Sequence, residues 1–178
     1  MTDQDTTPTD TDEPVEKGER IAKVMARAGL CSRRDAERWI VEGRVRVNGK
    51  VIETPATFIT DPTTVVVDGK PLEEPVEAQL WRYHKPPGLV TSHKDDQGRD
   101  TVFDKLPREL GRVVSVGRLD INSEGLLLLT NDGGLARELE LPSNDWVRTY
   151  RVRVFGFVDD AKLALLTDGI TYEGIKYG

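Results

Sequence analysis

The sequence predicts an α+β protein made of two small domains. Three observations support this fold class. The first third of the chain combines two helix-like segments with a hairpin signal, short strand-like segments recur in the rest, and turn residues separate them. With 178 residues, 37% of them apolar and 31% charged, the chain has the composition of a soluble globular protein.

The formal charge of −6 is concentrated at the N-terminus. Residues 1–16 contain six acidic residues and neither lysine nor arginine, so the other 162 residues hold 25 basic and 25 acidic groups. A segment rich in Asp, Thr and Pro cannot bury enough apolar surface to offset the entropy of ordering it. We therefore predict a disordered acidic tail over residues 1–18. Residues 19–50 reverse the balance, with nine basic and four acidic residues.

Two short helices are predicted after the tail. Gly29 can end the first helix as a left-handed cap. Ser32 then begins the second helix as its N-cap, with Asp35 three positions later in a capping-box arrangement, and Gly43 ends it. The apolar positions at helical spacing are Ile21, Val24, Met25 and Ala28 in the first helix and Ala36, Trp39 and Ile40 in the second.

A β-hairpin and a returning strand are predicted next. Residues 44–47 and 50–52 alternate between polar and apolar, and the Asn48-Gly49 pair between them is a strong signal for a two-residue turn. A later strand at residues 65–67 ends at a second turn, Asp68-Gly69. These elements define a small basic domain over residues 19–70.

A linker at residues 71–78 and a second domain at residues 79–178 complete the predicted organisation. The linker contains two prolines and three acidic residues. Residues 80–84 alternate like a strand and run into a Lys-Pro-Pro-Gly turn, whose prolines prevent a central strand from continuing. Further elements are predicted as buried strands at 113–116 and 126–129, an alternating strand at 148–154, a polar loop with a short helical stretch at 94–112, and a helix from Leu135 to Leu139 that ends before Pro142.

Asp120 is the strongest candidate for a catalytic residue. It lies between Gly117 and Gly125, which let the backbone bend tightly and approach a ligand, and Arg118 lies two positions before it. A short Arg-x-Asp segment before a strand is usually a surface turn with a weak ion pair. Where water is scarce, however, Arg118 can keep the carboxylate of Asp120 ionised.

The longer run GRLDINSEGLLLLTNDG, residues 117–133, resembles the signature of the ribosomal RNA pseudouridine synthases of the RsuA/RluB type. The Lys-Pro-Pro-Gly turn and residues 98–102 are also similar to patterns of that family. The helices and hairpin of residues 19–70 resemble an RNA-binding domain of the S-four type, first recognised in a ribosomal protein of the small subunit. The resemblance implies a small S-four-type α/β domain followed by a synthase catalytic domain that is built on a mixed, mainly antiparallel sheet.

The resemblance also implies the residues of the site. Asp120 and Arg118 would be catalytic, and Tyr150 would stack on the target base near the carboxylate. From the strand pattern alone, Tyr150 is an aromatic core residue, and Lys85 is a solvated lysine at a turn. Clustered cations favour contacts with phosphates, which give affinity without sequence information. The implied RNA-binding residues are Lys23, Arg27, Ser32, Arg33, Arg34, Arg38, Lys85 and Arg99.

The implied reaction is an isomerisation that needs no cofactor and no metal. The sequence has no dinucleotide fingerprint and no P-loop, and one cysteine with two histidines argues against a closed zinc site. What the reaction requires is a carboxylate near the ribose and a pocket for an extruded nucleotide. Whether Asp120 attacks C1′ or removes the 2′ proton is left open by the sequence.

The expected partner is ribosomal RNA, with a preference for the large-subunit RNA or its assembly intermediate. A cytoplasmic location is expected, because the apolar runs are far shorter than the roughly 20 residues that a membrane span needs. The protein is also expected to be a monomer. The alternative is a non-catalytic module that binds structured RNA on ribosomes. Family members continue beyond the equivalent of Gly178, so the catalytic domain is expected to be C-terminally incomplete, which leaves the activity of this chain open.

Overall fold

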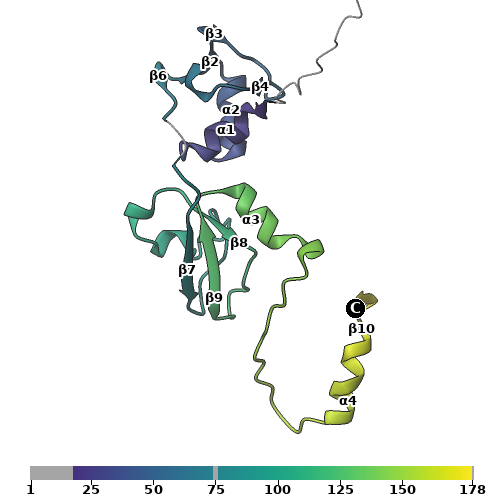
Figure 1. Ribbon diagram of the computed structural model, residues 1–178. Helices are drawn as coiled ribbons and strands as arrows, with labels where there is room; N and C mark the ends of the chain where they lie inside the picture. Colours follow the sequence, from purple (N-terminus) through teal and green to yellow (C-terminus); the bar gives the residue numbers. More distant parts are fainter. Residues whose placement is uncertain (1–17, 74–75, 178) are drawn as a thin grey trace, which may run out of the picture. The chain divides into compact units, whose positions relative to one another are not determined.

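A computed structural model describes residues 18–73 and 76–177, so nearly all of the predicted acidic tail lies outside the described residues (Figure 1). The chain divides into two units, one that ends at Asn144 and one that begins at Asp145, and each is described by itself. In the described ranges, no helix is both long enough and apolar enough to cross a membrane.

The two N-terminal helices form where the sequence predicts them, as α1 (Ile21–Arg27) and α2 (Arg33–Val41). Gly29 follows α1 with a φ of +76°, in the left-handed region that favours glycine. Ser32 caps α2, because its hydroxyl oxygen accepts the backbone N–H of Asp35 at 3.0 Å and the hydroxyl donates to the Asp35 carboxylate. The predicted capping arrangement is therefore confirmed.

The predicted hairpin is also confirmed. Asn48 and Gly49 both have positive φ angles, +50° and +77°, as the favoured two-residue hairpin turn requires. In residues 18–73 the antiparallel sheet has the strand order β3-β2-β5-β6, and a separate ladder pairs β1 with β4. The bounds are β1 (Glu19–Arg20), β2 (Val45–Val47), β3 (Lys50–Val51), β4 (Phe58–Ile59), the 3-10 helix η1 (Pro62–Thr64), β5 (Val65–Val67) and β6 (Lys70–Pro71).

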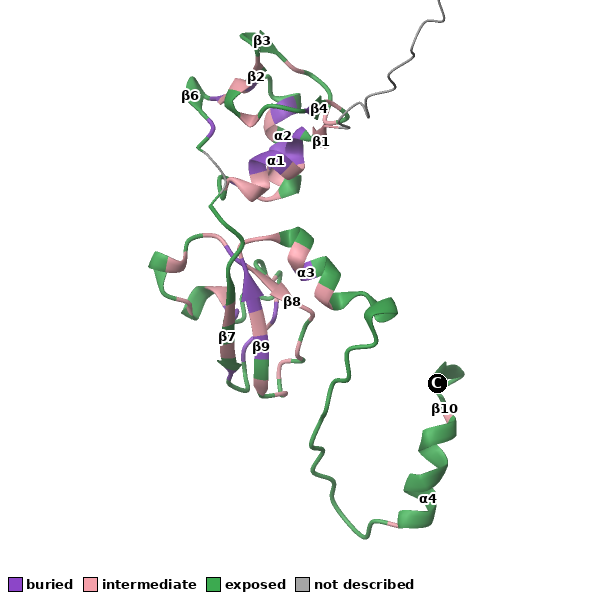
Figure 2. Ribbon diagram, in the orientation of Figure 1, coloured by how far each residue is buried: buried purple, intermediate pink, exposed green. Residues whose placement is uncertain are grey.

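The core of this domain lies between the helices and the sheet (Figure 2). Ile21, Ile40, Val45 and Val65 are fully buried in it. Leu72 joins the same core, and its backbone N–H donates to the carbonyl of Val65 at 2.9 Å. The predicted linker at residues 71–78 thus begins with two residues that pair or pack with the domain, because the second turn folds the chain back along β5.

The second described sheet is antiparallel, with the order β7-β9-β8, in agreement with the predicted fold class. Its strands are β7 (Leu80–Lys85), β8 (Val114–Val116) and β9 (Gly125–Thr130). The buried strand predicted at residues 126–129 is buried on one face only, since Leu127 and Leu129 are buried while Leu126 is 66% exposed. Only one face of this sheet packs on the core, so the side chains alternate between core and solvent.

Short helices complete the first unit. Asp132 caps α3 (Gly133–Glu140) through the backbone N–H groups of Gly134 and Leu135, and the helix packs beside β8 and β9 (Figure 1). The predicted helix before Pro142 is therefore confirmed. The 3-10 helices of this region are η2 (Phe103–Lys105), η3 (Arg108–Leu110) and η4 (Pro142–Asn144).

The second unit contains α4 (Asp160–Leu165), the 3-10 helix η5 (Leu166–Asp168) and a hairpin of β10 (Ile170–Tyr172) with β11 (Ile175–Tyr177). The predicted strand at 148–154 is not present, because these residues have no regular secondary structure. An alternating segment becomes a strand only where a neighbouring strand can bond its N–H and C=O groups, and no described strand pairs with this one.

Candidate active site and RNA-binding surface

Asp120 lies on the loop that joins β8 to β9, and its side chain is exposed. Gly117 precedes it with a φ of +71° and Gly125 follows with a φ of +128°, conformations that other residues rarely adopt. Leu119 points the other way and packs against the core of the second sheet. The loop therefore presents the carboxylate to solvent while its apolar neighbour anchors it.

Lys85, the last residue of β7, is fully buried under this loop. Its ammonium nitrogen lies within hydrogen-bond distance of four backbone carbonyl oxygens, those of Pro86 (3.1 Å), Asp120 (3.0 Å), Ile121 (3.3 Å) and Ser123 (2.8 Å). Burial lowers the pKa of Lys85, and the nearby negative charge of Asp120 opposes that shift. The side chain holds three carbonyls of the Asp120 loop in one place.

The prediction of Lys85 as an RNA-facing cation is thus contradicted by its position. Along β7 the side chains of Trp81 and Tyr83 face the core, and Lys85 continues the same alternation. A buried ammonium whose donors are already used by carbonyls has none to offer to a phosphate. The alternative of a solvated turn lysine is equally excluded by the burial.

Three further contacts fix the backbone of the loop. The hydroxyl of Thr91 donates to the carbonyl of Leu119 at 2.7 Å. The backbone N–H of Gly88 donates to the carbonyl of Ile121 at 2.6 Å, and the carboxylate of Glu140, at the end of α3, accepts the N–H of Gly117 at 2.5 Å. Thr91 and Glu140 were not predicted from the sequence, because no local pattern marks contacts between residues 28 and 23 positions apart.

Arg118 does not protect the charge of Asp120 in the way the sequence suggested. Both side chains are exposed, and no ion pair joins them in the described structure. An exposed pair gains little from Coulomb attraction and loses side-chain entropy, so solvent competes successfully. Arg118 remains next to Asp120 in sequence, with its guanidinium free to meet a ligand.

Tyr150 belongs to the second unit and is 63% exposed there. The two units are described separately, so its predicted place beside Asp120 stays a prediction. Tyr150 is not a core residue of its own unit, since its side chain is exposed there. Val152 and Val154, which share its place in the alternating pattern, are exposed as well.

Arg99 lies on an exposed loop whose shape is set by Asp95. The Asp95 carboxylate accepts the Arg99 backbone N–H at 2.9 Å and two guanidinium N–H groups at 2.7 and 3.1 Å, and it also accepts the N–H of Gln97. These bonds lower the pKa of Asp95 to about 2. Arg99 stays 44% exposed, so it is oriented by Asp95 and still reaches solvent.

The predicted RNA-binding cations of the N-terminal domain differ in how far they are neutralised. Glu19 forms ion pairs with both Lys23 and Arg27. Glu19 lies in β1, just before α1 begins, and from there its carboxylate reaches two cations of the helix. A phosphate that approaches these two cations has to compete with a carboxylate already bound to them.

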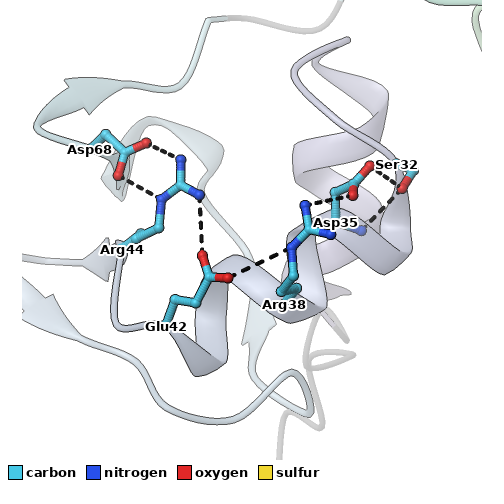
Figure 3. Close-up of polar contacts among 6 residues, drawn as sticks. All are labelled: Ser32, Asp35, Arg38, Glu42, Arg44 and Asp68. Carbon is cyan, nitrogen blue, oxygen red and sulfur yellow. Dashed lines mark hydrogen bonds and ion pairs between the residues drawn. The ribbon is translucent and has the colours of Figure 1, made fainter.

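Arg38 is similarly engaged in a chain of polar contacts that runs from the start of α2 to the turn after β5 (Figure 3). Arg38 pairs with Asp35 and Glu42. Arg44 pairs with Glu42, binds Asp68 through two guanidinium nitrogens and lies over the ring of Trp39. Among these polar contacts Ser32 acts as the cap of α2, and its predicted contact with RNA stays a prediction.

Arg33 and Arg34, by contrast, are exposed in the first turn of α2 and form no ion pair with a described residue. Arg33 also lines a cavity of about 400 Å³ together with Arg20 and Lys23. Two acidic residues, Glu19 and Glu37, contribute to the same cavity. The available positive charge of the predicted set is therefore greatest at Arg33 and Arg34.

No metal site emerges from the described part of the chain. It contains no group of three or more His, Cys, Asp or Glu side chains that could hold an ion. Cys31 is buried. Burial, and to a smaller extent the negative charge of Asp35, raises the pKa of its thiol to about 11, so the thiol stays protonated at neutral pH.

Two family models match the chain. The family described as S4 domain matches residues 19–66, and the family described as RNA pseudouridylate synthase matches residues 79–174. The second match contains Lys85, Arg99, Arg118, Asp120 and Tyr150. The order of the two domains is the one that the sequence analysis predicted.

Curated relatives carry related names. The chain is 52% identical over 141 residues to an uncharacterized RNA pseudouridine synthase of Rickettsia felis and 49% identical over 158 residues to one of Rickettsia bellii. It is 45% identical over 163 residues to the ribosomal large subunit pseudouridine synthase B of Yersinia pestis. These alignments include 79%, 86% and 88% of this chain, but only 61%, 69% and 51% of the respective relatives.

Proposed function

Because the chain belongs to the RNA pseudouridylate synthase family, we propose that it isomerises a uridine of ribosomal RNA to pseudouridine, with Asp120 as the reacting carboxylate. The reaction breaks the N1–C1′ bond, turns the uracil ring and joins C5 to C1′. The proton on C5 is lost to solvent and N1 gains one, so there is no net oxidation. No redox cofactor has to take part.

The observation that carries this proposal is the form of the Asp120 loop. It offers an exposed carboxylate on a backbone whose carbonyl groups are hydrogen-bonded by the ammonium group of Lys85 and the hydroxyl of Thr91. A carboxylate that must meet a ribose carbon gains from such preorganisation, because little rearrangement is needed when the substrate binds. The target nucleotide has to leave its stack to reach the loop.

Two routes are chemically consistent with a carboxylate at this position. Asp120 can attack C1′ as a nucleophile and displace the uracil, or it can remove the 2′ proton so that the uracil leaves as the glycal forms and then adds back through C5. Arg118 is proposed to bind a phosphate of the extruded nucleotide, and Tyr150 to stack on its base. The guanidinium of Arg118 has no described ion-pair partner, so its N–H groups are available for a phosphate.

The N-terminal domain supplies the proposed RNA contacts. The match to the S4 domain and the uncompensated charges of Arg33 and Arg34 support binding to a phosphate backbone. Large-subunit RNA is the proposed substrate, since several relatives are named as large-subunit enzymes. A protein that binds structured RNA without turning it over is the alternative.

Tritium release tests the proposal. Large-subunit and small-subunit RNA transcripts labelled with tritium at uridine C5 are incubated separately with the chain, and the released tritium is counted. We expect release from the large-subunit RNA only. Binding without release from either RNA would favour the alternative, and release from the small-subunit RNA alone would contradict the proposed substrate.

Asp120→Asn gives the matched catalytic test. The side chain of Asp120 takes no part in the contacts that hold the loop, so the variant should keep its stability and its affinity for RNA while release stops. Asp96→Asn, a change at another exposed aspartate of the same domain, serves as the control and should release tritium normally. Turnover by Asp120→Asn would exclude this carboxylate as the reacting group.

A further inference from the structure

The segment that enters β7 is bound by the side chain of Asn131, the residue that follows the C-terminal end of β9. Asn131 accepts the backbone N–H of Gln79 through Oδ1 at 2.8 Å and donates from Nδ2 to the carbonyl of Glu77 at 2.9 Å. Residues 76–80 are exposed, so burial does not hold this segment in place. Leu80 is held by its pairing with Thr130 of β9, and the described contacts that hold Gln79 and Glu77 are the two hydrogen bonds of Asn131.

The register of the sheet explains why an asparagine is found there. Leu80 pairs with Thr130, and this is the last pair of the β7–β9 ladder. Beyond it the backbone of β9 turns away into α3, which Asp132 caps. The amide of Asn131 offers one acceptor and a donor, and so replaces the backbone groups that a further ladder pair would have supplied.

We propose that Asn131 is a positioning residue that clamps the end of the interdomain linker. The last core residue of the N-terminal domain is Leu72. Four residues separate Leu72 from Glu77, whereas seven separate it from Leu80, the first residue of β7. The clamp thus shortens the tether between the two domains from seven residues to four.

When one domain has bound an RNA, the linker keeps the second domain close to the same RNA. A shorter linker raises the effective concentration of this second domain at its own site on the RNA. This concentration falls as roughly the −3/2 power of the tether length, so the difference between four and seven residues is worth about twofold. Asn131 would act on the binding of a substrate that contacts both domains, and leave the chemical step unchanged. This consequence rests on the proposed function, whereas the clamp itself does not.

Cleavage by a glutamate-specific endoprotease tests the clamp directly. The bond between Glu77 and Ala78 lies inside it, and a protease needs that segment to come free. We expect Asn131→Ala to be cut after Glu77 about ten times faster than the unchanged chain, the effect of losing one to two ordinary hydrogen bonds. Cleavage after Glu73 is the internal reference and should not change.

Two further variants sharpen the result. Asn131→Asp keeps the acceptor for Gln79 and loses the donor to Glu77, so its cleavage rate should be raised as well. Asn144→Ala is the matched control, because Asn144 also donates to a backbone carbonyl, that of Glu138, but lies away from the linker. An unchanged rate in Asn131→Ala, or an equal increase in Asn144→Ala, would overturn the clamp.

The kinetic readout separates positioning from catalysis. With tritiated RNA that carries the sites for both domains, Asn131→Ala should raise KM about twofold and leave kcat unchanged. A fall in kcat at constant KM would contradict the positioning role. If the chain releases no tritium at all, the proposed function fails, and the protease experiment still decides the clamp.

Discussion

The ammonium nitrogen of Lys85 lies 3.0 Å from the carbonyl oxygen of Asp120, so a buried cation supports the backbone of the residue whose side chain is proposed to react. The contact goes to the main chain and leaves the carboxylate free. Loop shape and carboxylate chemistry can therefore be changed separately, Lys85 for the first and Asp120 for the second.

Replacement of Lys85 should destabilise the fold. Lys85→Met keeps the length of the side chain but removes its charge and its three N–H donors, and the carbonyls of Asp120 and Ser123 lose their partner in a buried place. We expect the free energy of unfolding, measured in urea, to fall by about 3 kcal/mol. Lys94→Met, at an exposed lysine of the same domain, should change it by no more than about 0.5 kcal/mol. A similar small change for both variants would show that the carbonyl contacts contribute little.

Arg118→Ala should affect RNA and leave stability alone. The guanidinium is exposed and has no described ion-pair partner, so its removal should change the free energy of unfolding by less than about 0.5 kcal/mol. Tritium release should fall, because the proposed phosphate contact is lost. Arg137→Ala, at an exposed arginine of α3, provides the comparison and should release tritium at the normal rate. A large loss of stability in Arg118→Ala would mean that the arginine pairs within the protein after all.

The loop that carries Arg99 should weaken in acid. The hydrogen bonds from Arg99 lower the pKa of Asp95 from its usual 3.8 to about 2 in the folded chain. A carboxyl group whose folded pKa is depressed contributes stability above its unfolded pKa and loses it as the pH falls toward the folded value. The stability difference between the unchanged chain and Asp95→Asn should therefore be constant near pH 7 and shrink between about pH 4 and pH 2. Denaturant midpoints across this range measure it, and a difference that does not depend on pH would argue against the ion pair.

The charge of Arg34 should appear in the salt dependence of RNA binding. Arg34→Gln removes an exposed, unpaired cation, so the slope of log K against log salt should become smaller by about 1, with equal effects on different RNA sequences. Arg44→Gln is the matched control, because Arg44 is already bound by Glu42 and Asp68. It should lower stability and leave the slope unchanged. Equal slopes for both variants and the unchanged chain would show that Arg34 makes no phosphate contact in the complex with RNA.

Much of the fold could be predicted because its signals are local. Ser32 and Asp35 mark the start of α2, and Asn48-Gly49 sets the hairpin, each through contacts within a few residues of the chain. The strand predicted around Tyr150 did not follow from its alternation, because a strand also needs a partner elsewhere in the chain. The exposure of Leu126 was missed for a related reason, since a run of four leucines does not reveal that one face of the sheet is open.

The sequence by itself determined the two domains, the two N-terminal helices with the hairpin that follows them, and the place of Asp120 between two glycines, since these depend on residue type and short spacing. Only the tertiary structure decided what surrounds that aspartate. In the tertiary structure Lys85 is buried and binds the carbonyls of the Asp120 loop, Arg118 has no described ion-pair partner, and Asn131 binds the end of the linker. These roles depend on which distant backbone carbonyls and N–H groups come together, and such groups are the same in every residue, so no sequence pattern identifies them.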